Sequence, residues 1–268
     1  MRIPSVSYLS NHNRSMQRTY RNLASGKRVN TAADDATALA IASKLTSHVN
    51  GTNVGISNAR EAQSMLNIAD GAMGSVTDAM QRINELSIQA YNGTYSNSDR
   101  SAIQAEIDQL KESIGSITSQ TKFNEMNVLD GSMGSTHVAS NADGSGMNIN
   151  MPQFSLKGLG IADYDISSGK YDENAVGNFN VSAIGNALGT VNAKRSYIGA
   201  AYNGLGHTIS NNSNAAYNMT AGLSRIQDTD YAQGSMDLKK QQILNTYSIM
   251  MQRKLINNAD GQVRMMLG

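Results

Sequence analysis

Residues 59–90 read AREAQSMLNIADGAMGSVTDAMQRINELSIQA, and this stretch decides the fold. Apolar or small residues recur in it at alternating steps of three and four, with one polar exception, Ser87. This is the spacing of a heptad seam, and it predicts one long helix that packs lengthwise against partner helices. The seam positions are Ala59, Ala62, Leu66, Ala69, Met73, Val76, Met80, Ile83, Ser87 and Ala90.

The C-terminal part of the chain carries a second and longer seam. From Val181 to Ile226 the three-four spacing is interrupted only by Arg195 and Asn212. A polar residue in a seam commonly fixes the register of the helices or their number. The alternative is that the stripe bends outward there, and the sequence leaves both interpretations open.

The middle of the chain, residues 122–176, differs in composition. Gly, Ser, Asn and Asp cluster there, and residues 147–151 alternate with period two, which predicts a small inserted β-hairpin with loops. Ahead of it, a polar turn at residues 92–99 ends the first long helix and starts a second one. The predicted fold class is therefore mainly α: a long antiparallel, coiled-coil-like helical bundle formed by the N- and C-terminal segments.

The composition excludes several classes of function. The 268 residues have a net charge of +1, and only 16% of them are charged. The absence of Cys excludes disulfides, thiolate metal sites and Cys nucleophiles. There is no long basic block and no apolar window of membrane-span length, so we expect neither nucleic-acid binding nor membrane insertion. The first twenty residues lack the apolar run of a signal peptide, so any export is expected to proceed without a cleaved signal.

Few charged residues are candidates for chemistry. Asp34–Asp35 and Asp228–Asp230 have no His or Glu at a ligand interval, so helix capping is favoured over a metal or acid–base role. The first thirty residues contain six basic and no acidic side chains, for which a solvated face is favoured over membrane or nucleic-acid binding. With no convergent catalytic site, we predict no enzyme activity, no metal and no cofactor.

Both ends of the chain carry shorter apolar stripes. Helices of this kind are marginal alone in water and need a partner, either each other or other subunits. We therefore predict the stripes to be assembly contacts. Their residues are Val6, Leu9, Met16, Tyr20 and Leu23 near the N-terminus and Ile243, Tyr247, Met250 and Leu255 near the C-terminus.

Several motifs, in order along the chain, resemble the bacterial flagellin family over roughly residues 1–130 and 177–268. They are LASGKRVNTAADDA (23–36) with LAIA (39–42), MQRINELSIQA (80–90), QTKFN (120–124) with NVL (127–129), and LSRIQDTDYA (223–232). The last two groups resemble the family's entry into its β region and the join between its final helices. The short middle implies a flagellin that lacks the large outer domains.

The resemblance implies a structural subunit of the extracellular flagellar filament that self-assembles into a helical polymer for motility. Three parts are expected: a terminal-helix inner core (1–36 and 230–268), a helical bundle (37–121 and 177–229) and a β/loop insertion (122–176). The implied partners are other copies of the chain, an export chaperone, and the filament cap and junction proteins.

The resemblance further implies a contact with the vertebrate flagellin-sensing Toll-like receptor. It would centre on Arg82 and Leu86, four apart on one helix. The family's acidic position on the following helix falls on Ser113 here, and a one-residue slip of the alignment would place the adjacent Glu112 there instead. Alternatively, Arg82 makes only surface pairs and Leu86 only bundle contacts. The candidate contact residues are Arg82, Glu85, Leu86, Gln89 and Ser113.

Two other functions share parts of the pattern. The hook–filament junction protein of the same assembly shares the end helices, and a non-flagellar coiled-coil adaptor would share the heptads. LAIA after the aspartate pair and the motif at 223–232 favour a flagellin over the junction protein. An adaptor does not account for the paired motifs at the two ends.

Overall fold

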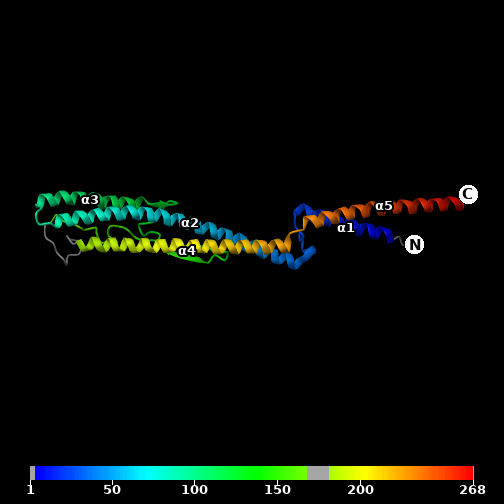
Figure 1. The fold of residues 1–268 in the computed structure, drawn as a ribbon, viewed down its shortest axis with the longest axis horizontal. Coiled ribbons are helices and arrows are strands. Elements are labelled where there is room, and N and C mark those ends of the chain that lie inside the picture. Colours follow the sequence, from blue (N-terminus) through cyan, green and yellow to red (C-terminus); the bar gives the residue numbers. More distant parts are fainter. Residues whose placement is uncertain (1–3, 168–180, 268) are drawn as a thin grey trace. The chain divides into compact units, whose positions relative to one another are not determined.

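The structure, a computed structural model, describes residues 4–167 and 181–267, and it is mainly helical there, as predicted (Figure 1). The helices are α1 (Pro4–Ser25), α2 (Ala32–Tyr91), α3 (Asn97–Gln120), α4 (Val181–Gln227) and α5 (Tyr231–Leu267). The strands are β1 (Lys122–Phe123), β2 (Met126–Asn127), β3 (Ser135–Ala139) and β4 (Gly146–Asn150). The chain forms two compact units, residues 1–49 with 217–268 and residues 50–216. The predicted three-part division concerns layers of an assembly and stays a prediction.

In the unit of residues 50–216, α2 and α4 run antiparallel. Asp70 pairs with Arg195 at 3.0 Å. About two turns back along α2, Gln63 Nε2 donates to the carbonyl oxygen of Tyr202, which lies about two turns further along α4, at 3.1 Å. Every seam position of α2 from residue 59 to 90 is buried, so the predicted seam is confirmed. The polar member, Ser87, satisfies its hydroxyl by donating to the carbonyl oxygen of Ile83 at 2.6 Å.

The two polar seam residues of α4 both have partners. Arg195 reaches Asp70 on α2, and Asn212 Nδ2 donates to the carbonyl oxygen of Ser140, just after β3, at 2.7 Å. The interpretation that they fix register is therefore favoured over an outward bend of the stripe. Hydrogen bonding to the Asp70 carboxylate, and then its negative charge, hold the pKa of Arg195 above its ordinary value.

The turn and second helix form as predicted. Ser96 and Asp99 make a capping box at the start of α3: Asp99 N donates to Ser96 Oγ at 3.3 Å, and Ser96 N donates to Asp99 Oδ2 at 2.9 Å. Each bond satisfies an amide that has no partner within the helix. The inward side of α3 adds Ile107 and Ile114 to the core shared with α2 and α4.

The predicted β-hairpin is confirmed as β3 paired antiparallel with β4, with Thr136 opposite Ile149. The chain that follows buries Phe154, Ile161 and Tyr164 in the same core. Its course is fixed where Ile166 N donates to Gln104 Oε1 on α3 at 2.9 Å. The predicted insertion beyond residue 167 lies outside the described residues.

The hairpin end lies directly on α2 at Gly55. A Cβ at this position would stand 2.2 Å from the carbonyl oxygen of Ser140, which leaves no room for a side chain. We expect Gly55→Ala to lower the free energy of unfolding by about 1–3 kcal/mol, because backbone must move to admit the methyl group. Gly71→Ala is the matched control on the same helix: its Cβ would enter open space, and it should raise stability by about 0.5–1 kcal/mol. Urea unfolding measures both, and equal stability of the two variants would contradict the close approach.

Candidate assembly surface on the terminal helices

The start of the α1–α5 pair is fixed by backbone hydrogen bonds between two distant parts of the chain. After α1, Gly26 adopts φ +70°, the left-handed conformation that glycine supplies at helix C-termini. Arg28 N then donates to the carbonyl oxygen of Gln227 at 2.6 Å, and Thr229 N donates to that of Gly26 at 2.9 Å. Asp230 Oδ1 accepts from Gln233 N at 3.0 Å and caps α5, as predicted for this aspartate.

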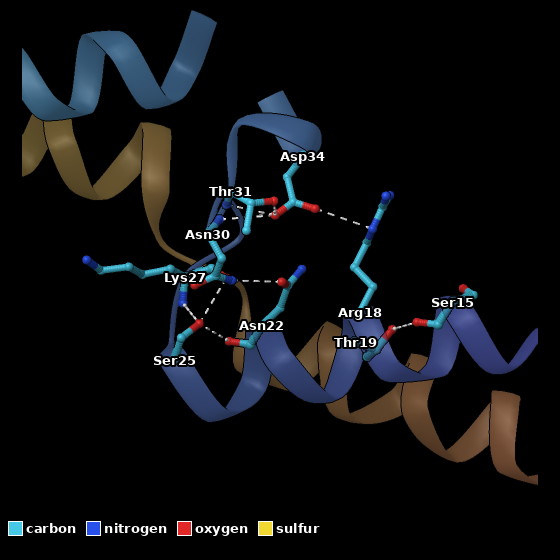
Figure 2. Close-up of polar contacts among 9 residues, drawn as sticks. All are labelled: Ser15, Arg18, Thr19, Asn22, Ser25, Lys27, Asn30, Thr31 and Asp34. Carbon is cyan, nitrogen blue, oxygen red and sulfur yellow. Dashed lines mark hydrogen bonds and ion pairs between the residues drawn. The ribbon is translucent and has the colours of Figure 1, made fainter. Parts of the chain in front are cut away.

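The other predicted caps lie at the start of α2 (Figure 2). Asp34 Oδ2 accepts from Thr31 N at 3.0 Å and from Thr31 Oγ at 2.9 Å, while Arg18 Nε of α1 lies 3.5 Å from Asp34 Oδ1. Asp35 has an extended backbone that interrupts the helix, and its Oδ1 accepts from Ala38 N at 2.9 Å. Capping is therefore confirmed for both carboxylates.

The Asp34 carboxylate makes this junction sensitive to acid. Hydrogen bonds from the Thr31 hydroxyl, then from the Thr31 amide, hold the pKa of Asp34 below its ordinary value of 3.8. A carboxyl with a lowered pKa stabilises the fold at neutral pH, and this stabilisation is lost as the pH falls through the folded-state pKa. We expect Asp34→Asn to be less stable than the parent at pH 7, with a difference that shrinks to nothing well below pH 3.8. Thermal unfolding of both proteins across pH measures this, and a difference independent of pH would contradict it.

In the terminal unit, α1 and α5 lie side by side (Figure 1) and run antiparallel. His12 Nε2 lies 2.8 Å from the carbonyl oxygen of Gln241, and Gln242 Nε2 donates to Tyr20 Oη at 2.8 Å. Leu23 packs so closely on Gly234 that a Cβ there would stand 2.9 Å from Leu23 Cδ2.

The side of α5 turned toward α1 is polar, contrary to the usual orientation of an amphipathic helix. Its half-buried residues are Gly234, Ser235, Leu238, Gln241, Gln242, Asn245, Ser248 and Gln252. Two of their amide oxygens, Gln241 Oε1 and Asn245 Oδ1, are buried and accept no hydrogen bond from the described part of the chain. Such groups lower the stability of the pair.

The opposite side of α5 presents large apolar side chains to solvent. At 100° per residue, five of them gather along one line of the helix, and we call this set the apolar ridge. Its members, Met236, Ile243, Tyr247, Met250 and Met251, are between 45% and 69% exposed. The predicted contact Leu255 is also exposed and lies at the edge of this line.

The structure places the remaining predicted assembly residues on α1. Met16 and Leu23 are half-buried, and Tyr20 is exposed apart from its hydroxyl contact with Gln242. Val6 and Leu9 belong to α1, but their side chains lie outside the described part. The sequence pattern also predicted Met251 as part of an exposed apolar surface, and it is exposed. Sequence reasoning missed Met236, although it stands one heptad before Ile243.

A second candidate site lies on α2 and α3. Arg82 NH2 donates to Glu106 Oε1 at 2.8 Å, and NH1 donates to Glu85 Oε2 at 3.2 Å, all three side chains being exposed. These bonds, the one to Glu106 first, hold the pKa of Arg82 above its ordinary value. We call Arg82, Glu85 and Glu106 the charged cluster.

The other predicted receptor residues do not all join this cluster. Leu86 is 2% exposed and belongs to the core, so its side chain is not offered at the surface. Ser113 is exposed but lies seven residues beyond Glu106, about 10 Å further along α3. Gln89 is exposed and donates to Tyr95 Oη at 2.9 Å. Sequence reasoning missed Glu106, which the antiparallel register of α2 and α3 around the turn at residues 92–96 places opposite Arg82.

Over the described residues, none of the helices combines the length and apolarity needed to cross a membrane. In the same residues, no group of three or more His, Asp and Glu side chains is placed to hold a metal ion.

Comparison with known proteins gives consistent matches at both ends of the chain. The bacterial flagellin N-terminal helical region matches residues 3–133, and the bacterial flagellin C-terminal helical region matches residues 181–263. The flagellar filament 33 kDa core protein of Treponema phagedenis is 34% identical over 249 residues, 88% of this chain and 87% of that protein. The flagellin of Bacillus subtilis is 30% identical over 275 residues, 91% of this chain and 90% of that protein.

A solved structure described as a flagellar hook-associated protein, from Vibrio parahaemolyticus, aligns with a TM-score of 0.60 over 73% of this chain and 100% of that chain. At 15% identity this likeness shows the fold alone, so it does not favour the junction-protein alternative.

Long helices from both ends of the chain with a small β insertion between them, matched at both ends by flagellin regions, define a helical subunit of the filament-forming class. The chain belongs to the bacterial flagellin family, in a short form, and is a structural subunit of the flagellar filament. The family predicted from the motifs is thereby confirmed.

Proposed function

We propose that the apolar ridge of α5 is the surface through which subunits pack against one another in the filament. The observation that supports it is the orientation of α5, with amides toward α1 and Ile243, Tyr247 and Met250 toward solvent. Burying one such side chain contributes roughly 1.5–3 kcal/mol, so several of them favour association strongly enough to offset the entropy of ordering subunits.

In the proposed arrangement, residues 1–36 and 230–268 form the innermost layer and residues 37–121 and 177–229 the next, with residues 122–176 as the β/loop insertion. The side of α5 that faces α1 is polar, and the pair gains partners by polymerising. Contacts between unlike faces of successive copies give an open helical filament when the rotation between copies does not close into a ring, and we propose this case here. The role is structural, and we propose no catalysis.

The ridge also supports a role for partners other than the chain itself. An exposed apolar line on a free subunit promotes aggregation. We propose that an export chaperone covers α5 before assembly and that the filament cap and junction proteins contact the same terminal helices in the finished flagellum. During assembly another subunit would replace the chaperone, whereas the cap and junction proteins would occupy the position of a subunit.

We expect the double variant Ile243→Gln, Tyr247→Gln to remain a helical monomer and to lose filament formation, because both substitutions remove apolar surface without disturbing the side that faces α1. Arg253→Gln, an exposed position of the same helix off the ridge, is the matched control and should assemble like the parent. Sedimentation and electron microscopy measure assembly, and circular dichroism measures helicity. Normal filaments from the double variant, or from a chain lacking residues 236–268, would remove the ridge from the interface.

We further propose that the charged cluster is the part of this flagellin that the vertebrate flagellin-sensing Toll-like receptor contacts. Arg82 and Glu85 stand exposed on α2, and Glu106 supplies an acidic neighbour from α3. The resemblance had placed the acidic position at Ser113, where this chain has no carboxylate. Leu86 is left out of the proposed contact because it is buried.

We expect Arg82→Ala to weaken receptor binding of the monomer, since it removes a charge from the proposed contact and leaves two carboxylates without their partner. Arg60→Ala, an exposed arginine of the same helix, should bind as the parent does. Surface plasmon resonance on the receptor ectodomain measures both variants. Equal affinity of Arg82→Ala and the parent would exclude the charged cluster from the contact.

A further inference from the structure

Three of the five residues of the apolar ridge are methionines. Met236, Met250 and Met251 are 67%, 62% and 45% exposed. The thioether of methionine is readily oxidised, and its conversion to a sulfoxide turns an apolar side chain into a polar one. The chain has no cysteine that would compete for an oxidant. Access by solvent therefore decides which sulfur atoms react.

Other methionines of the same chain are shielded. Met73 and Met80 lie in the seam of α2 and Met65 lies beside it, and each of the three is at most 3% exposed. An oxidant reaches them only if the unit opens. Met126 on β2 provides the opposite comparison: it is 46% exposed, like Met251, but it belongs to the small β region and not to the ridge.

We propose that Met236, Met250 and Met251 form an oxidative modification site, at which peroxide converts the free subunit into a form that does not assemble. In each event one oxygen atom passes from hydrogen peroxide to Sδ: an S–O bond forms, the O–O bond breaks, the sulfur loses two electrons and the peroxide leaves as water. The inference rests on the proposed role of the ridge as the packing surface between subunits.

The physical consequence follows from burial. A sulfoxide oxygen is a strong hydrogen-bond acceptor, and the side chains around it on the ridge are Ile243 and Tyr247, of which only the tyrosine hydroxyl could donate. Burying the modified side chain at an interface leaves the acceptor without a partner and disfavours association. In the filament the same sulfur atoms are covered by the neighbouring subunit and are protected, so the site acts on subunits before they assemble.

The experiment treats full-length monomer with hydrogen peroxide and identifies oxidised positions by peptide mass spectrometry. We expect oxidation at 236, 250, 251 and 126 before 65, 73 and 80. The critical concentration for polymerisation, measured by sedimentation, should rise about tenfold, since one unpaired buried polar group weakens association by roughly that factor. Methionine sulfoxide reductases of both stereospecificities, supplied with a dithiol, should restore the original value. Preformed filaments given the same treatment should keep their ridge methionines reduced.

Matched variants identify the residues responsible. Replacing all three ridge methionines by leucine conserves apolar volume and should leave assembly intact but insensitive to peroxide. Met126→Leu should leave it as sensitive as the parent. Oxidised parent that polymerises at the original concentration overturns this inference, as does a core methionine that reacts first or an effect that reductase does not reverse. If untreated parent forms no filament, or filaments form with the ridge open to peroxide, the proposed function of the ridge fails instead.

Discussion

Burial of the α2 seam is the constraint on which the rest of the larger unit depends. Ten positions at alternating steps of three and four leave one helix with an apolar line that it cannot cover by itself. The line is covered only when α4 returns antiparallel beside it and α3 folds back after the turn. Asp70 with Arg195 and Asn212 with Ser140 then select one register among the several that apolar contacts alone would allow. The hairpin fits where Gly55 leaves space for its backbone.

The terminal pair obeys a different constraint, because its best apolar surface is left outside it. Gln241 and Asn245 lie in the contact with α1, while Ile243 and Tyr247 lie away from it. If the ridge faced α1, the pair would be more stable alone, and little would remain to drive association. The same orientation of α5 therefore leaves the pair weak in the single subunit and gives it the strong packing that we propose for the filament.

Much of this fold could be predicted from the sequence because it depends on local spacing. The seam, the capping box at Ser96, the aspartate caps and the alternation in β4 are all set by residues a few positions apart. Whether the apolar side of α5 faces α1 or solvent depends on partners outside the chain. The apolar spacing could therefore predict the stripe but not which surface packs against it. Likewise, Glu106 can be placed opposite Arg82 only when the register between α2 and α3 is known. Without that register, the expected partner position fell on Ser113, about two helical turns further along α3.

The identity of the buried side chains also has a mechanical consequence. Met73 and Met80 occupy seam positions that branched residues would fill more rigidly, and Met65 is buried beside the seam. Methionine has an unbranched side chain with three rotatable bonds, and it adapts its shape at low energy. The helices can therefore slide slightly along one another while the seam stays filled. A long polymer that bends requires its building blocks to shorten on one side and lengthen on the other, and a seam of this composition gives the subunit that elastic compliance.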